Sequence, residues 1–124
     1  MRIVVLSDSH RNVGRLFAAV ERHLDNADLY IFLGDGEDDF DAVIDAYPHI
    51  KYERVCGNCD WYSNYPDKME IEFAGKRIFF SHGHPYNVKF GYENIIAEAK
   101  RRNADIVLFG HIINIPNTST ACIL

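Results

Sequence analysis

Side chains that can bind a metal ion recur along this chain, each directly after a short apolar run. Six residues stand in this position: Asp8 and His10 after residues 3–6, Asp35 after 29–33, Asn58 after 50–55, His82 after 77–80 and His111 after 105–109. They supply carboxylate, amide and imidazole donors without a thiolate, a set that suits Mn²⁺, Fe, Zn²⁺ or Ni²⁺ better than Ca²⁺. Six ligands exceed the needs of one tetrahedral site, so the pattern predicts two metal ions that share a carboxylate. Two metals about 3.5–4 Å apart lower the pKa of a bridging water and stabilise in-line attack at phosphorus.

The apolar runs have the composition of β-strands. They are rich in β-branched and aromatic residues and lie at 3–6, 29–33, 50–55, 69–73, 77–80 and 105–109. Between the fourth and fifth runs, Ala74-Gly75 predicts a tight hairpin turn. Because the carboxyl ends of strands in an open α/β sheet share one edge, the six ligands are expected to meet there.

Three stretches between these runs have the apolar spacing of helices. The first extends from Val13 to Leu24 with Asn12 as its N-cap. The second holds apolar residues within 40–47, behind the acidic residues 37–39, and the third holds them within 92–99, before the basic residues 100–102. The order of strands and helices predicts an α/β protein with a mixed, mostly parallel sheet.

Length and composition are those of one globular domain, residues 1–124, in which 115–124 are expected to form an irregular tail. The net charge of −5 excludes a broad cationic surface for extended nucleic acid or an anionic membrane. No run of about 18 apolar residues is present to span a bilayer. Cys56 and Cys59 form a C-x-x-C pair without the further partners that a zinc site or a disulfide framework needs. We therefore expect a cytoplasmic protein with reduced cysteines, and a homodimer is compatible with the sequence.

The residues around the six ligands form an ordered series of motifs. They are Asp8-Ser9-His10, Gly34-Asp35, Gly57-Asn58-Cys59-Asp60, His82-Gly83-His84 and Gly110-His111. The series resembles the calcineurin-like metallophosphoesterases, in particular their small YfcE-like phosphodiesterase branch and its relative Vps29. The resemblance covers residues 1 to about 116 and implies a β-sandwich flanked by helices.

The resemblance also implies how the ligands are shared. One metal would be held by Asp8, His10 and Asp35, and the other by Asp35, Asn58, His82 and His111, with Asp35 as the bridge. Mn²⁺ is the first candidate for both ions, with Fe, Zn²⁺ and Ni²⁺ as further candidates. The expected catalytic residues are Asn58, which helps to offset developing charge, and His84, which faces the phosphate. The implied reaction is hydrolysis of a small phosphodiester or phosphomonoester by a hydroxide that bridges the metals.

The loop that follows Asn58 carries residues with less specific signals. Asp60 is expected to be structural and to orient a loop. Trp61, Tyr62 and Tyr65 either border a substrate cleft or pack, and the sequence leaves both open. Cys59 stands where many larger relatives have a histidine that protonates the leaving group, and a thiol is a poorer acid. The chain is therefore expected to favour leaving groups that depart without protonation, such as aryl phosphates.

Two departures from the family pattern favour an alternative function. The last motif usually reads Gly-His-x-His, but this chain has Ile113 at the second histidine, and the neighbouring Asn114 is an oxygen donor. Relatives also continue past this motif through closing strands, so the chain resembles a C-terminally shortened member. Both departures fit a Vps29-like scaffold that binds proteins and has weak or lost catalysis.

The substitution Ile113→His is predicted to raise metal-dependent phosphoesterase activity, because it returns a fourth ligand to the first metal. A tenfold gain corresponds to about 1.4 kcal/mol of activation free energy. Steady-state hydrolysis of an aryl phosphodiester with added Mn²⁺ measures it. Asp35→Asn is the control and should abolish activity in both backgrounds. A variant that binds a second metal but hydrolyses nothing would favour the scaffold function.

Overall fold

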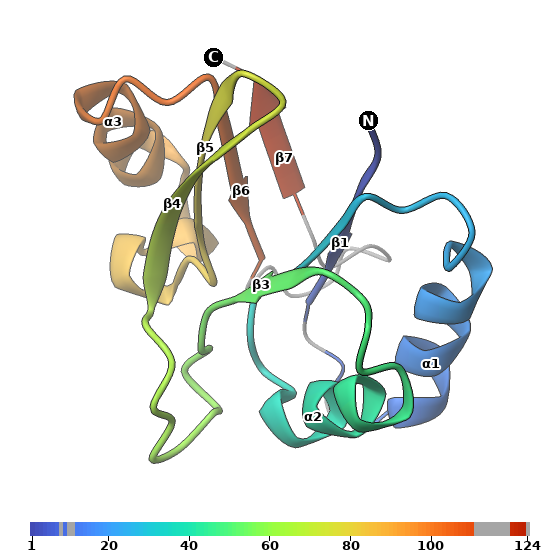
Figure 1. Ribbon diagram of the computed structural model, residues 1–124. Helices are drawn as coiled ribbons and strands as arrows, with labels where there is room; N and C mark the ends of the chain where they lie inside the picture. Colours follow the sequence, from blue (N-terminus) through green and yellow to red (C-terminus); the bar gives the residue numbers. More distant parts are fainter. Residues whose placement is uncertain (8, 10–11, 111–119, 124) are drawn as a thin grey trace.

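Two β-sheets lie face to face at the centre of the molecule, and α-helices cover their outer faces (Figure 1). The structure is a computed structural model that describes residues 1–7, 9, 12–110 and, for the backbone, 120–123. The first sheet is fully parallel and has the order β1 (Ile3–Leu6), β2 (Leu29–Phe32), β3 (Tyr52–Arg54). Its register pairs Leu6 with Phe32 and Phe32 with Arg54. These three strands therefore end side by side.

The second sheet is mixed and has the order β4 (Lys68–Phe73), β5 (Lys76–Ser81), β6 (Ile106–Phe109), β7 (Thr120–Ile123). Strands β5 and β6 are parallel, whereas β4 and β7 run antiparallel to their neighbours. The predicted hairpin turn joins β4 to β5, with Phe73 paired to Lys76. Its central residues Ala74 and Gly75 have φ values of 53° and 78°, as a type I′ turn requires.

The three predicted helices are all present. Helix α1 (Val13–Arg22) begins at Asn12, whose side chain accepts a hydrogen bond from Arg15 N at 3.3 Å. Helix α2 (Glu37–Ala46) has three acidic residues in its first turn, and α3 (Glu93–Arg101) has two basic residues in its last turn. These charges match the sign of the helix dipole at each end. Two short 3₁₀ helices, η1 (His84–Tyr86) and η2 (Val88–Phe90), connect β5 to α3.

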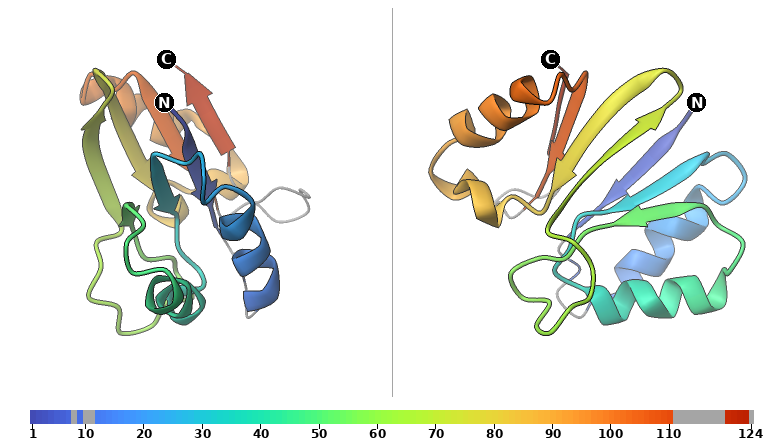
Figure 2. Two further views of the ribbon diagram at one scale, coloured as in Figure 1. Left: turned by 45° about the vertical axis from the view of Figure 1, so that its right-hand side comes forward. Right: turned by 60° about the vertical axis from the view of Figure 1, so that its left-hand side comes forward.

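The alternation of side chains along the strands determines the layers. In β2 and the residue after it, Leu29, Ile31 and Leu33 face the second sheet and pack against Ile78 and Phe80. The intervening side chains of Tyr30 and Phe32 face α1 and α2. On the far side, Phe79, Val107 and Phe109 of the second sheet face α3. The order is thus helices, sheet, sheet, helix (Figure 2), while the outer face of the edge strand β4, with Lys68, Glu70 and Glu72, is exposed.

The predicted α/β sandwich is confirmed, with two corrections to element bounds. The strand predicted over 50–55 is restricted to Tyr52–Arg54. The irregular tail predicted over 115–124 is wrong for Thr120–Ile123, which form β7 against β6. This four-residue strand has too weak a local pattern to predict, and its hydrogen-bond partners come from the sheet edge. Residues 115–119 and 124 lie outside the described residues. No helix among the described residues is long and apolar enough to span a membrane.

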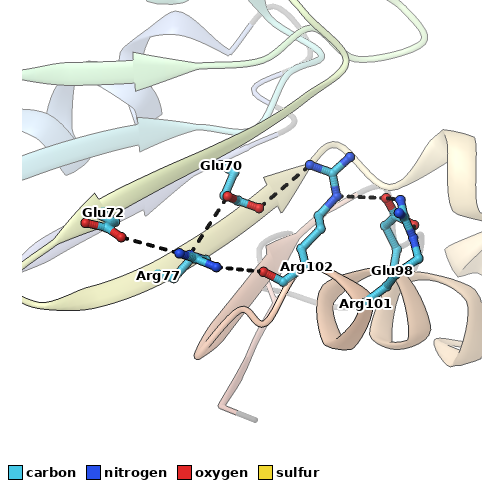
Figure 3. A network of polar contacts seen from close by, with 6 residues as sticks. All are labelled: Glu70, Glu72, Arg77, Glu98, Arg101 and Arg102. Atoms are coloured by element: carbon cyan, nitrogen blue, oxygen red, sulfur yellow. Dashed lines mark hydrogen bonds and ion pairs between the residues drawn. The ribbon is translucent and has the colours of Figure 1, made fainter.

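A network of charged side chains connects α3 to the β4–β5 hairpin (Figure 3). Glu98 accepts hydrogen bonds from Arg101 at 2.6 and 3.1 Å and from Arg102 Nε at 2.7 Å. Arg102 Nη1 also lies 3.8 Å from Glu70, whose other oxygen lies 3.9 Å from Arg77 Nε. The guanidinium of Arg102 stacks over Phe79 at 4.7 Å, so the network covers the edge of the α3 core.

Glu98 is predicted to titrate far below an ordinary glutamate. Hydrogen bonds from Arg101 and then Arg102 lower the pKa of Glu98 from 4.5 to about 2. Because this pKa is depressed in the folded state, the stabilisation is present above about pH 4.5 and is lost as pH falls through about 2. NMR titration of the Glu98 carboxyl carbon measures it, and Arg101→Gln should return the midpoint towards 4.5 more than Arg102→Gln. A wild-type midpoint near 4.5 would contradict the network.

Candidate functional site

The ends of five strands meet at one edge of the sandwich, as predicted. Backbone hydrogen bonds continue just past the strands, from Leu33 N to Leu6 O at 2.8 Å and from Val55 N to Phe32 O at 3.0 Å. In the second sheet, Gly110 N donates to His82 O at 2.9 Å. The residues that follow β1, β2, β3, β5 and β6 are therefore brought to one place.

Asp35 and His82 form the buried centre of this edge. Asp35 follows β2 and is 3% exposed, and His82 follows β5 in the other sheet and is fully buried. Asp35 Oδ2 lies 3.2 Å from His82 Nε2. Two of the predicted ligands, 47 positions apart in the sequence, are thus in direct contact across the two sheets.

The hydrogen-bond partner of His82 Nδ1 shows that this ring nitrogen carries a proton. His82 Nδ1 lies 2.9 Å from Leu33 O, and a carbonyl oxygen only accepts, so Nδ1 carries the proton. Nε2 then faces Asp35 Oδ2, to which it donates when the ring is protonated, and beside which it offers a lone pair to a metal ion when the ring is neutral. Histidines that bind metals commonly have this arrangement, in which the other nitrogen donates to a backbone carbonyl. Two ligands about 2.1 Å from one ion at a right angle are about 3 Å apart, close to the observed separation. The pair therefore fits a divalent metal.

The loop after β3 is attached to Asp35 through its backbone. Asp35 Oδ1 accepts a hydrogen bond from Cys59 N at 2.8 Å, and Asn58 lies exposed in the turn just before it. The carboxylate of Asp60 accepts backbone hydrogen bonds from the residues around Asp35 and from Gly57. The expectation that Asp60 orients a loop is confirmed.

His84 lies beside His82 at the start of η1. The ring centroids are 5.5 Å apart and the planes are tilted by 52°. Burial lowers the pKa of His84 from its ordinary value, and the electrostatic effect of the neighbouring His82 imidazole lowers it further, while nearby carboxylates act in the opposite direction. The imidazole of His84 is therefore mainly neutral at pH 7.

The structure describes some of the predicted ligands and not others. Asp35, Asn58 and His82 are described, whereas Asp8, His10 and His111 lie outside the described residues, as do Ile113 and Asn114. No group of three or more His, Cys, Asp or Glu side chains arranged to hold a metal occurs within the described part of the chain. The predicted division of ligands between two metals stays a prediction.

An acidic cleft of about 510 Å³ opens beside Asp35. Its walls come from the start of α2 and from the loop after β3: Asp35, Gly36, Glu37, Asp38, Asp39, Cys59, Asp60 and Trp61. Trp61 is 78% exposed and lines this cleft, whereas the ring of Tyr65 packs under the guanidinium of Arg54 at 4.1 Å. Tyr65 therefore packs, and Tyr62 is 99% exposed. That Trp61 borders a substrate stays a prediction.

Arg54 is a structural residue of the site that sequence reasoning missed. It is 3% exposed, with Nη1 2.7 Å from Asp41 Oδ1 and Nη2 3.1 Å from Glu37 O. Its guanidinium also lies over Phe40, so it joins β3 to the first turns of α2. The available signal was a basic residue inside an apolar run, after a helix with an acidic beginning.

Comparison with known proteins gives consistent matches. The profile of the calcineurin-like phosphoesterase superfamily domain matches residues 1–113. The chain is 30% identical over 112 residues to the probable metallophosphoesterase YsnB of Bacillus subtilis, covering 90% of this chain and 63% of that protein. A predicted phosphoesterase from Streptococcus pneumoniae superposes with a TM-score of 0.71 and 26% identity, covering 88% of this chain and 60% of that one. The chain thus spans less than two thirds of the length of both relatives.

The likeness to a second solved structure shows the fold alone. Wild-type Vps29 from Entamoeba histolytica, solved in complex with Zn²⁺, superposes with a TM-score of 0.67 at 16% identity. The match covers 98% of this chain and 72% of that one.

The close approach of the loops after β2 and β3 predicts that Gly57→Ala destabilises the protein. A Cβ at Gly57 would lie closer than 3.0 Å to both Oδ1 and the backbone N of Asp35. The free energy of unfolding should fall by about 1–3 kcal/mol, as for other overpacked sites. Gly14→Ala is the matched control, because its Cβ would meet only Asn12 Oδ1 at 4.0 Å, and it should gain up to about 1 kcal/mol. Equal urea midpoints for both variants would contradict the close packing.

Proposed function

Since this chain belongs to the calcineurin-like phosphoesterase superfamily, we propose that it hydrolyses a small phosphodiester or phosphomonoester with two divalent metal ions, Mn²⁺ before Fe, Zn²⁺ or Ni²⁺. The observation that carries the proposal is the buried contact of Asp35 Oδ2 with His82 Nε2 at the shared edge of the strands. A carboxylate and an imidazole are costly to bury, and together they match the ligand chemistry of these metals.

The residues that would hold the metals are those assigned from the sequence. Asp8, His10 and Asp35 would hold one ion, and Asp35, Asn58, His82 and His111 the other. Bound divalent metals would supply the positive charge that lowers the pKa of a water nucleophile and polarises the phosphoryl group. The contact of Asp35 with His82 supports this assignment, and so does the bond from Cys59 N to Asp35 Oδ1, which brings Asn58 to the same edge.

The chain's own groups hold this site in a defined geometry. The bond from His82 Nδ1 to Leu33 O orients the imidazole, and the bond from Cys59 N orients the carboxylate of Asp35. His84, mainly neutral at pH 7, lies beside His82 and would face the phosphate as a hydrogen-bond partner. Cys59 is a poor acid at the place of a leaving-group acid, so aryl phosphate esters are the expected test substrates.

The experiment is hydrolysis of bis-(p-nitrophenyl) phosphate by protein freed of metal with a chelator and then given Mn²⁺. Activity should depend on the metal, and His82→Asn should lower kcat/KM at least about 100-fold. This loss is larger than the loss expected when a residue that only orients a metal ligand is replaced. The matched control is His49→Asn, because His49 is an exposed histidine that precedes β3 and does not follow the carboxyl end of a strand. Equal loss in both variants, or hydrolysis without any metal, would contradict the proposal.

The second candidate function is the protein-binding scaffold of the Vps29 kind. It is favoured by Ile113, which replaces the second histidine of the family's last motif, and by the likeness of the fold to Vps29. A scaffold would show no Mn²⁺-dependent hydrolysis in the wild type and no gain from Ile113→His. The same assays therefore distinguish the two functions.

A further inference from the structure

One carboxylate, that of Asp60, accepts hydrogen bonds from four backbone amides. Oδ1 accepts from Gly36 N at 2.9 Å and Glu37 N at 3.0 Å, and Oδ2 accepts from Asp35 N at 2.8 Å and Gly57 N at 2.7 Å. A carboxylate that caps a helix is usually that of the helix's own N-cap residue. Asp60 instead accepts hydrogen bonds from two segments of the chain. These segments follow different strands and lie about 24 residues apart in the sequence.

The first of these segments is the beginning of α2 together with Asp35. Helix α2 has Gly36 as its N-cap, which offers no side-chain acceptor, so Asp60 caps the helix from outside. Asp35 has a φ of 60°, in the left-handed region that L residues rarely adopt. The bond from Asp35 N to Asp60 Oδ2 helps to hold this conformation, which directs the carboxylate of Asp35 to His82.

The second segment is the turn that carries Asn58. Asp60 N donates to Gly57 O at 3.2 Å, and Gly57 N donates back to the side chain of Asp60, so the turn closes around Asn58. Cys59 N in the same turn donates to Asp35 Oδ1. The two segments thus exchange bonds in both directions, and a Cβ at Gly34 or Gly57 would clash with the other segment.

We propose that Asp60 is the positioning residue of the metal site, whose carboxylate sets the spacing between Asp35 and Asn58. This inference rests on the proposed function, in which both residues hold the same metal. Asp60 itself does not need to touch the metal. Four backbone amides occupy its carboxylate. Asp60 would affect metal binding by fixing the backbone that carries Asp35 and the backbone that carries Asn58.

The direct test is Mn²⁺ affinity of Asp60→Asn, measured by calorimetry without any substrate. An asparagine has one accepting oxygen, so two of the four amides would face an NH₂ group that cannot accept from them. The affinity should fall about 10–100-fold, as for other groups that orient ligands. The matched control is Asp105→Asn, because Asp105 Oδ2 also accepts a backbone amide, from Arg77 at 2.8 Å in the second sheet. Its one remaining oxygen can still accept this amide, so the variant should keep the Mn²⁺ affinity of the wild type.

Chemical rescue separates the missing carboxylate from general damage. In Asp60→Ala the four amides are left without their acceptor, and convergent amides bind anions. Added formate should restore part of the lost Mn²⁺ affinity, whereas formamide, of the same shape but neutral, should not. The wild type and Asp105→Asn should not respond to formate beyond its weak competition for Mn²⁺.

Hydrogen exchange of the wild type provides a measurement that does not depend on how any variant folds. If one carboxylate holds both segments, the amides of Asp35, Gly36, Glu37 and Gly57 should open together and exchange with one protection factor. Independent exchange of Gly57 and Gly36, or wild-type Mn²⁺ affinity in Asp60→Asn, would overturn the inference. A wild type that binds no Mn²⁺ would instead overturn the proposed function, and the inference with it.

Discussion

The burial of His82 places a constraint on the whole molecule, because each of its ring nitrogens needs a partner away from water. Both partners come from the other sheet: Leu33 O for Nδ1 and Asp35 Oδ2 for Nε2. A buried imidazole without them would cost several kcal/mol, about 2–7 by transfer estimates. The contacts of both ring nitrogens therefore require that the end of β5 lies beside the end of β2 when the two sheets pack. The apolar layer of Ile31, Leu33, Ile78 and Phe80 then supplies the burial that holds this arrangement.

The same edge concentrates negative charge, and backbone dipoles offset it. Asp35 and Asp60 lie beside the acidic first turn of α2, in a chain whose net charge is −5. Amide groups donate to both carboxylates, and the helix N-terminus favours anions nearby, so the carboxylates stay compatible with the fold. A divalent cation would relieve the remaining repulsion. The electrostatic arrangement thus favours the folded protein and a cation at the same place.

The two polar networks differ in how much they contribute to the stability of the fold. The surface network of Glu70, Arg77, Glu98 and Arg102 borders the α3 core, and exposed ion pairs of this kind contribute little to stability. Arg54, by contrast, is buried between Phe40 and Tyr65 and bonds Asp41 and Glu37 O. Asp41 is half-exposed, but its removal would leave the buried guanidinium of Arg54 without its opposite charge, which is more costly. Arg54 therefore has the larger part in placing α2, and through it the loop of Asp35.

The sequence alone determined the first six strands, the three helices and the hairpin turn, and it placed a potential ligand after five strands. These features depend on the periodicity of apolar residues and on turn and cap preferences, which are local properties of the chain. The family pattern supplied the sandwich in which His82 and Asp35 meet. Only the tertiary structure decided that Asp60 serves two loops, that Arg54 is buried, and that Thr120–Ile123 form a strand. Each of these depends on partners from distant segments, and no local pattern specifies which segments become neighbours when the two sheets pack.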